Sequence, residues 1–285
     1  MPAVLWCVRL ACPTAGIALA SEAGTCLAWD VNQGLQLIDR GGSVLAQSRH
    51  ASPITAACHA AAGGAIAIGD DACVSWLDPD LKTRWRRTWP HRVTAVALDP
   101  FAKCLAVAGA GWIRLIDDSG RLLAEPIATA RPLYRLTFVP AAPVLLGAAD
   151  FGLITSFDLP SGAVRWHDNP VIHIGDLRSS GDGGVVAAAC FSDGVRRYDS
   201  DGRPLATLAT AQPCRHVDLT DDGRRLLVGS IFGSVAGYDD AGIVRFDQPF
   251  EHGLTGLQLA PLGDAGIVAL DDGRVLALDL SSELK

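Results

Sequence analysis

The sequence predicts an all-β fold made of seven repeated sheets, and three observations support this prediction. First, an apolar stretch that ends in aspartate recurs along the whole chain at intervals of 39 to 41 residues. Second, short apolar segments separated by turn-forming residues fill each interval, which is typical of strands. Third, no stretch shows the 3.6-residue period of an amphipathic helix. Four short antiparallel strands about every forty residues describe the blade of a β-propeller.

The repeat is recognised by the strand that ends in aspartate. Its seven copies read LQLID, VSWLD, WIRLID, ITSFD, VRRYD, VAGYD and VLALD, and they end at Asp39, Asp78, Asp117, Asp158, Asp199, Asp239 and Asp279. A unit of this size cannot bury both faces of its sheet alone, so it packs on its neighbours. We therefore expect a single propeller domain over residues 1–285, with blades at about 15–50, 51–91, 92–130, 131–169, 170–211, 212–251 and 252–280 plus 3–10.

The turn after the aspartate has a uniform chemistry. A glycine follows most of these aspartates by three or four residues, as Gly162 follows Asp158. Glycine supplies the positive φ of a tight hairpin, and an aspartate accepts hydrogen bonds from the backbone two residues further on. We interpret the seven aspartates as turn residues. Four residues after this glycine stands Trp166, and Trp85, Phe246 or an alanine occupies the equivalent place in other units, so we expect this side chain to fill the gap between neighbouring sheets.

The two ends of the chain complement each other. The seventh unit has three apolar segments and lacks the fourth, whereas AVLWCVRL at residues 3–10 has no unit of its own. We expect this N-terminal segment to form the outermost strand of the last blade, which removes an unpaired sheet edge. The apolar side chains expected to become buried are Val4, Leu5, Trp6, Val8 and Leu10.

The composition of the chain limits the classes of partner and the compartment that we expect for the protein. The formal net charge of −7 repels nucleic acid and anionic membranes. No run of about eighteen uncharged apolar residues is present, and Arg9 interrupts the N-terminal apolar segment, unlike an export signal. Eight cysteines without C-x-x-C spacing favour a reducing compartment, although their even number leaves disulfides open. We expect a cytoplasmic protein with protein partners and without nucleic-acid or membrane partners.

Two known repeat families resemble this chain over essentially its whole length. HRVTAVALDPFAKCLAVAGAGWIRLID and RHVDLTDDGRRLLVGSIFGSVAGYD resemble WD repeats, and FDLPSGAVRW resembles the repeats of quinoprotein-type propellers. The first resemblance implies a platform for protein–protein interaction. No unit ends in the Trp-Asp pair of WD repeats, and only His50, His91 and His252 stand where their loop histidine precedes a blade. The second family binds pyrroloquinoline quinone and calcium on eight blades, so with seven units we expect no cofactor.

Signatures of catalysis and metal binding are missing from the sequence. It contains no G-x-S-x-G, no H-E-x-x-H, no phosphate-binding glycine loop and no C-x-x-C pair. An enzymatic function is therefore uncertain and less favoured than a binding function, and no metal site is expected.

One candidate site is a polar cluster on three consecutive blades. The innermost strands of units 2, 3 and 7 begin ITAAC, VTAVA and LTGLQ, whereas LYRLT, IHIGD and CRHVD occur in units 4, 5 and 6. The second set contributes Arg135, His173, Asp176, Arg215, His216 and Asp218. These residues either form a channel-mouth pocket for an anionic ligand or acidic peptide, or they make hydrogen bonds and ion pairs that fix the blades.

A second candidate is the basic strand DLKTRWRRTWPHR at residues 80–92. Its candidate binding residues are Lys82, Arg84, Trp85, Arg86 and Arg87. They either dock an acidic protein partner or form a charged edge that prevents sheet-to-sheet association.

From these observations we expect a non-catalytic platform for protein–protein interaction within a larger assembly. The alternative is an enzyme or a small-anion binder that uses the polar cluster at the channel mouth of blades 4 to 6.

Overall fold

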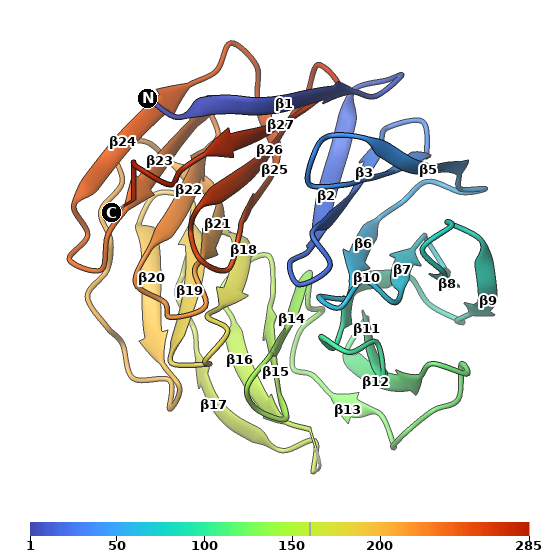
Figure 1. Ribbon diagram of the computed structural model, residues 1–285. Coiled ribbons are helices and arrows are strands. Elements are labelled where there is room, and N and C mark those ends of the chain that lie inside the picture. Colours follow the sequence, from blue (N-terminus) through green and yellow to red (C-terminus); the bar gives the residue numbers. More distant parts are fainter. Residues whose placement is uncertain (160, 285) are drawn as a thin grey trace.

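The structure is a computed structural model that describes residues 1–159 and 161–284. Seven antiparallel sheets stand in a ring around a central channel, which confirms the predicted seven-bladed β-propeller (Figure 1). Within each blade the strands follow one another from the channel to the rim. No helix in the described part of the chain is long and apolar enough to span a lipid bilayer.

The blades are numbered here from the N-terminus. The strands of blade 1 are β2 (Thr14–Ala20), β3 (Thr25–Asp30), β4 (Gly34–Ile38) and β5 (Val44–Arg49), and those of blade 2 are β6 (Ala56–His59), β7 (Ile66–Gly69), β8 (Cys73–Leu77) and β9 (Thr83–Thr88). Blade 3 contains β10 (Val93–Leu98), β11 (Cys104–Gly109), β12 (Trp112–Asp117) and β13 (Ile127–Ala128), and blade 4 contains β14 (Arg135–Val139), β15 (Val144–Ala148), β16 (Ile154–Asp158) and β17 (Val164–Asp168).

The remaining blades complete the ring. Blade 5 contains β18 (Ile174–Ser179), β19 (Val185–Cys190) and β20 (Gly194–Asp199), and blade 6 contains β21 (Cys214–Leu219), β22 (Leu226–Ser230), β23 (Ser234–Tyr238) and β24 (Val244–Pro249). Blade 7 contains β25 (Leu254–Leu259), β26 (Ala265–Leu270), β27 (Arg274–Asp279) and the N-terminal strand β1 (Ala3–Arg9).

The outermost strand is short or broken in two blades. In blade 3, β13 has only two residues, and in blade 5 the rim segment touches β20 through isolated bridges at Pro204 and Leu208. Proline lacks the N–H that a ladder requires, so Pro204 interrupts the regular pairing of that segment. The rim of the ring is therefore less regular than its inner strands.

The turns after the seven aspartates are built as expected. Asp199, for example, accepts hydrogen bonds from Asp201 N at 2.9 Å and Arg203 N at 2.8 Å. Gly202 in the same turn has φ +79°, and in blade 2 the equivalent Leu81 takes φ 60°. The aspartates are thus used by their own hairpins.

Aromatic side chains at the rim pack on the aspartate turn of the next blade. Trp166 of blade 4 stacks on Tyr198 of blade 5 with ring centroids 5.6 Å apart, and its Nε1 donates to Ser200 O at 3.2 Å. A side chain at Gly202 would overlap the Trp166 ring. Trp6 and Trp85 make the same contact with the turns of blades 1 and 3.

Where the rim position is alanine, the neighbouring residues supply the missing volume. Ala46 of blade 1 and the buried Leu81 of blade 2 belong to the same apolar cluster. In the next two interfaces of this kind, Ile127 lies beside Gly162 and Leu208 lies beside Gly242. The expected gap-filling role of this rim position is therefore met by different residues in successive blades.

The N-terminal strand closes the ring, as predicted. β1 pairs with β27 in antiparallel register from Ala3↔Asp279 to Arg9↔Arg274 (Figure 1). The prediction that all five apolar side chains of this segment become buried was wrong for Val4 and Leu5, which are each 55% exposed. A register shift between Val4 and Trp6 breaks the strict alternation of the strand, so two successive side chains face outward.

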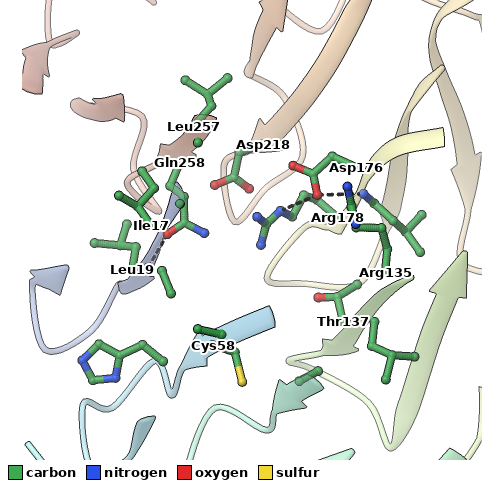
Figure 2. A pocket seen from close by; sticks show the side chains of 18 of the residues that line it. Ile17, Leu19, Cys58, Arg135, Thr137, Asp176, Arg178, Asp218, Leu257 and Gln258 are labelled. Carbon is green, nitrogen blue, oxygen red and sulfur yellow. Dashed lines mark hydrogen bonds and ion pairs between the residues drawn. The ribbon is translucent and has the colours of Figure 1, made fainter. Parts of the chain in front are cut away.

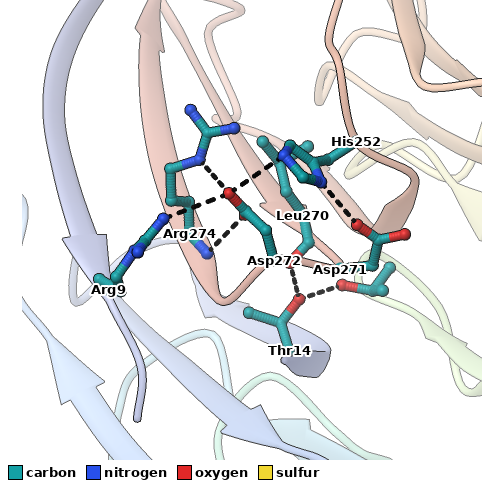
Figure 3. A network of polar contacts seen from close by, with 8 residues as sticks. Arg9, Thr14, His252, Leu270, Asp271, Asp272 and Arg274 are labelled. Atoms are coloured by element: carbon teal, nitrogen blue, oxygen red, sulfur yellow. Dashed lines mark hydrogen bonds and ion pairs between the residues drawn. The ribbon is translucent and has the colours of Figure 1, made fainter. Parts of the chain in front are cut away.

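A polar network reinforces this closure (Figure 3). Asp272 lies between β26 and β27 and accepts a hydrogen bond from Arg274 Nε at 2.6 Å. It also accepts one from Arg9 Nη2 of β1 at 3.4 Å. His252 bridges Asp271 at 3.3 Å and Asp272 at 3.6 Å. Although desolvation opposes it, hydrogen bonding to Arg274 lowers the pKa of Asp272.

Replacing Trp6 should test the closure. Trp6→Ala removes the Nε1 hydrogen bond to Arg40 O, 2.8 Å long, and the packing on Gly42. We expect a loss of about 2 to 3 kcal/mol in the free energy of unfolding, measured by urea denaturation. Val4→Ala on the same strand is the control and should change it by less than about 0.5 kcal/mol, because Val4 is exposed. Equal effects of the two substitutions would contradict this account of the closure.

Candidate functional site

The innermost strands enclose a cavity of about 580 Å³ in the channel. Each innermost strand contributes several residues to its lining, and the strand registers identify two alternate positions among them that are equivalent from blade to blade. In blades 1, 2 and 3 the pairs are Gly16 and Ala18, Ala56 and Cys58, and Ala95 and Ala97, respectively. In blades 4, 5, 6 and 7 they are Arg135 and Thr137, Asp176 and Arg178, His216 and Asp218, and Gly256 and Gln258. At these paired positions blades 1 to 3 carry only small side chains, and blades 4 to 7 carry polar ones except at Gly256; elsewhere in the lining His59 of blade 2 adds a polar group.

The structure brings five of the six residues of the predicted polar cluster to this cavity. Arg135, Asp176, Arg215, His216 and Asp218 line it.

The sixth, His173, lies outside the cavity. It forms an isolated bridge with Phe151, its ring meets the Phe151 ring edge-on at 5.2 Å, and its Nδ1 is 4.0 Å from Asp150. His173 is adjacent to β18 in sequence but points away from the channel, because the first residues of the strand belong to the connection between blades.

Several polar side chains of the cluster bind the backbone of the next blade. Arg135 Nε donates to Gly175 O at 2.7 Å, and Asp218 Oδ2 accepts from Leu259 N at 2.8 Å. Gln258 in turn accepts from Leu19 N, which joins blade 7 to blade 1 (Figure 2). Inner strands of different blades share no ladder, so these side chains supply hydrogen bonds between them. Such contacts favour a register-fixing role for part of the cluster.

Arg178 is the polar residue that the sequence interpretation missed. It stands two residues after Asp176 on the same strand face and lies between Asp176 and Asp218 (Figure 2). Its Nε is 3.5 Å from Asp176 Oδ1, and its side chain is 31% exposed to the cavity. Its Nε is buried without a hydrogen bond, and the carboxylates of Asp176 and Asp218 both act on its charge. The two-residue alternation in IGDLRS was the signal that could have identified it.

Burial among the inner strands shifts two pKa values in opposite directions. Desolvation raises the pKa of Asp218 to about 6, although Arg178 and the bond from Leu259 N favour the ionised form. Desolvation also lowers the pKa of His216 to about 4, although Asp176 favours its protonation. At neutral pH His216 is therefore uncharged, and Asp218 is mostly ionised.

The basic strand uses most of its side chains within the molecule. Arg86 Nη2 is 2.7 Å from the buried Asp70, and Arg87 Nη1 donates to Gly120 O at 2.8 Å. Trp85 stacks on Trp76 with ring centroids 5.5 Å apart. Lys82 pairs at the surface with Asp80, and Arg84 is exposed.

A group of exposed aromatic residues lies on one face of the ring. This face, the upper face, carries the connections between blades and the turns between second and third strands. Main-chain hydrogen bonds join these segments: Phe191 N donates to His173 O at 3.1 Å, and Cys214 N donates to Phe191 O at 3.0 Å. The turns of blades 4, 5 and 6 expose Phe151, Phe191 and Phe232, and Tyr134 is exposed at the start of the innermost strand of blade 4. Sequence reasoning had not identified this group.

The comparisons with known proteins add no family to this fold. No protein-family model matches the chain, and no curated protein matches it either. The fold itself makes the chain a seven-bladed β-propeller protein. In the described part of the chain, no three His, Cys, Asp or Glu side chains gather in a way that could hold a metal ion.

The opposed pKa shifts predict a pH effect that single substitutions reveal. A lowered His216 pKa destabilises the fold as the pH falls below 6.5, and a raised Asp218 pKa stabilises it as the pH falls through 6. In the native chain the two effects oppose each other. As the pH falls from 7 to 4.5, the free energy of unfolding of His216→Gln should therefore rise relative to that of Asp218→Asn, by at least about 1 kcal/mol. Urea denaturation across this range measures it, and parallel profiles for the two variants would refute the assignment.

Proposed function

We propose that the protein is a non-catalytic, WD-repeat-like platform of the cytoplasm that binds a protein partner through its upper face at blades 4 to 6. The single observation that carries this proposal is the exposure of Phe151, Phe191 and Phe232 on three consecutive blades. The seven-bladed propeller is a common scaffold for protein interaction, so the fold supports the same class of function.

Clustered exposed aromatic residues favour a docking surface over chance exposure. Single apolar residues at a surface are ordinary, whereas a contiguous apolar patch marks an interaction site. The exposed fractions are 44% for Phe151, 42% for Phe191 and 69% for Phe232. At the equivalent turns, blade 2 has Asp71, blade 7 has Asp272 and blade 1 exposes the smaller Val31. Exposed aromatic side chains at these turns are therefore a property of blades 4 to 6 and not of the repeat.

Arginine at the channel mouth suits an acidic partner. Arg135 and Arg215 stand at the start of β14 and β21, at the upper ends of the innermost strands. Aromatic and arginine side chains are the residues that anchor protein interfaces most often. A partner segment that combines apolar and acidic side chains would complement this surface.

The basic strand supports the proposal less well than the upper face does. Arg86, Arg87 and Trp85 are engaged in contacts within the molecule, so a partner would have to compete for them. Only Lys82 and Arg84 remain on that strand as readily available cations.

A comparison of two faces tests the proposed platform. The native chain, Phe151→Ser/Phe191→Ser/Phe232→Ser and the control Phe101→Ser/Leu262→Ser are used to capture partners from extract of the source cells. Phe101 and Leu262 are exposed in turns between first and second strands, on the opposite face. We expect a stoichiometric partner that the control retains and the triple variant loses, with at least about a tenfold drop in affinity.

Two outcomes would contradict the proposal. One is a partner retained equally by both variants, and the other is a partner lost only with the control. Thermal unfolding of each variant shows that the substitutions leave the ring folded, since all five side chains lie at the surface.

A further inference from the structure

We propose that the channel cavity binds a small monocarboxylate with an apolar body, with its carboxylate at Arg178. This site shares Arg135 and Arg215 at the channel mouth with the proposed partner surface, but binding of the small anion does not depend on a protein partner. A cavity of about 580 Å³ that opens to solvent has the size of ordinary small-molecule sites.

Unused hydrogen-bond donors on one wall are the first part of the argument. A guanidinium has five N–H donors and no acceptor. Arg178 Nε is buried without a hydrogen bond and faces Asp176 at 3.5 Å, the carboxylates of Asp176 and Asp218 both act on its charge, and the side chain lines the cavity. A carboxylate can accept two parallel hydrogen bonds from such a group. Arg178 thus offers the cavity a hydrogen-bond donor, Nε, that its carboxylate neighbours leave unused.

The position of Arg178 is not explained by packing alone. In blades 6 and 7 the equivalent Asp218 and Gln258 accept a backbone N–H from the next blade. Arg178 cannot accept, and Leu219 N of blade 6 is bound instead by its neighbour Asp218 Oδ1 at 3.0 Å. The arginine has therefore replaced a register-fixing acceptor without taking over its hydrogen bond.

The charge of the cavity lining favours a monoanion over a dianion. The guanidinium groups of Arg135, Arg178 and Arg215 are matched by the carboxylates of Asp176, Asp218 and Asp221, and His216 is neutral. A bound monoanion adds one unbalanced negative charge, whereas a dianion such as a phosphate ester adds two and is repelled more strongly by Asp176 and Asp218 beside Arg178.

The charges also differ along the channel. Arg215 lies at the upper end of β21, and Asp221 lies in the turn after the lower end of this strand. Desolvation raises the pKa of Asp221, and the nearby carboxylates of Asp182 and Asp222 raise it further. An anion is thus attracted at the upper mouth and repelled at the lower one.

The opposite wall accounts for the apolar body. Ala18, Cys58, Ala95 and Ala97 occupy the positions that carry polar side chains in blades 4 to 6. Their short side chains leave the space of the cavity next to apolar surface. A hydrocarbon chain or ring placed there would bury apolar area that acetate cannot.

Hexanoate is the probe that tests both halves of the site. Its binding to the full chain is measured by isothermal titration calorimetry at pH 7.5, beside acetate, 1-hexanol and phenyl phosphate. We expect hexanoate to bind at least about tenfold more tightly than each of the other three. Acetate lacks the apolar body, 1-hexanol lacks the charge, and phenyl phosphate carries a second charge. Comparable binding of 1-hexanol or phenyl phosphate would overturn the proposal, as would no binding of hexanoate at about 10 mM.

Three substitutions locate the binding. Arg178→Met should weaken hexanoate at least about tenfold, and Arg215→Met should weaken it about two- to fivefold because it acts from the mouth. Arg84→Met is the matched control, since Arg84 is exposed on the outermost strand of blade 2. Arg215 is exposed and its substitution leaves the fold intact, so it decides the question even if Arg178→Met unfolds. Unchanged binding in Arg215→Met, or equal loss in Arg84→Met, would place hexanoate elsewhere and refute the site.

Discussion

The pairing of β1 with β27 is the constraint on which the whole ring depends. Each blade has two apolar faces and needs a neighbour on both, so an open row of seven blades would leave one face bare at each end. The closing blade takes three strands from the end of the chain and one from its beginning. The same N-terminal strand carries Trp6 onto the turn of blade 1 and brings Arg9 to Asp272, so ladder, packing and charge all act at one junction.

The interfaces between blades fill the same space at the rim with different residues. A large rim side chain meets glycine in the turn of the next blade, as Trp85 meets Gly120, whereas a rim alanine is compensated by a large turn residue such as Leu81 or by a second rim side chain such as Ile127. What is kept from blade to blade is the volume at the junction, because interiors are packed at nearly constant density. Trp166 is therefore part of the framework, and its Nε1 bond to the backbone explains why an indole is suited to that place.

The fold could be predicted from the sequence because its determinants are local. Each Asp turn, each short apolar strand and the forty-residue spacing can be identified within one repeat, and the absence of a fourth segment in the last unit predicted the partner of residues 3–10. The prediction that failed, the burial of every apolar side chain in the N-terminal segment, depended on the exact register of a strand. Two successive side chains, Val4 and Leu5, face outward because of a bulge that no local pattern announces.

The candidate site was only partly predictable, because it depends on which side of an innermost strand each residue faces. Arg135, Asp176, His216 and Asp218 were identified, since they are charged residues on otherwise apolar strands. His173 was grouped with them by sequence proximity, although it belongs to the connection before β18. Which arginine donors remain free could not be read from spacing at all, since it depends on the neighbouring blade.

Blades 1 to 3 show what the ring itself requires at the channel. Glycine, alanine and cysteine at the two equivalent channel positions are enough there, and no charged side chain occupies those positions. Charges at the same positions of blades 4 to 6 carry a desolvation cost, visible in the displaced pKa values of His216 and Asp218. Cross-blade hydrogen bonds offset part of this cost for Asp218 and Arg135, but Arg178 makes none. The blades that bear this cost are also those that expose phenylalanine at the upper face, and this coincidence is why both proposed sites lie on blades 4 to 6.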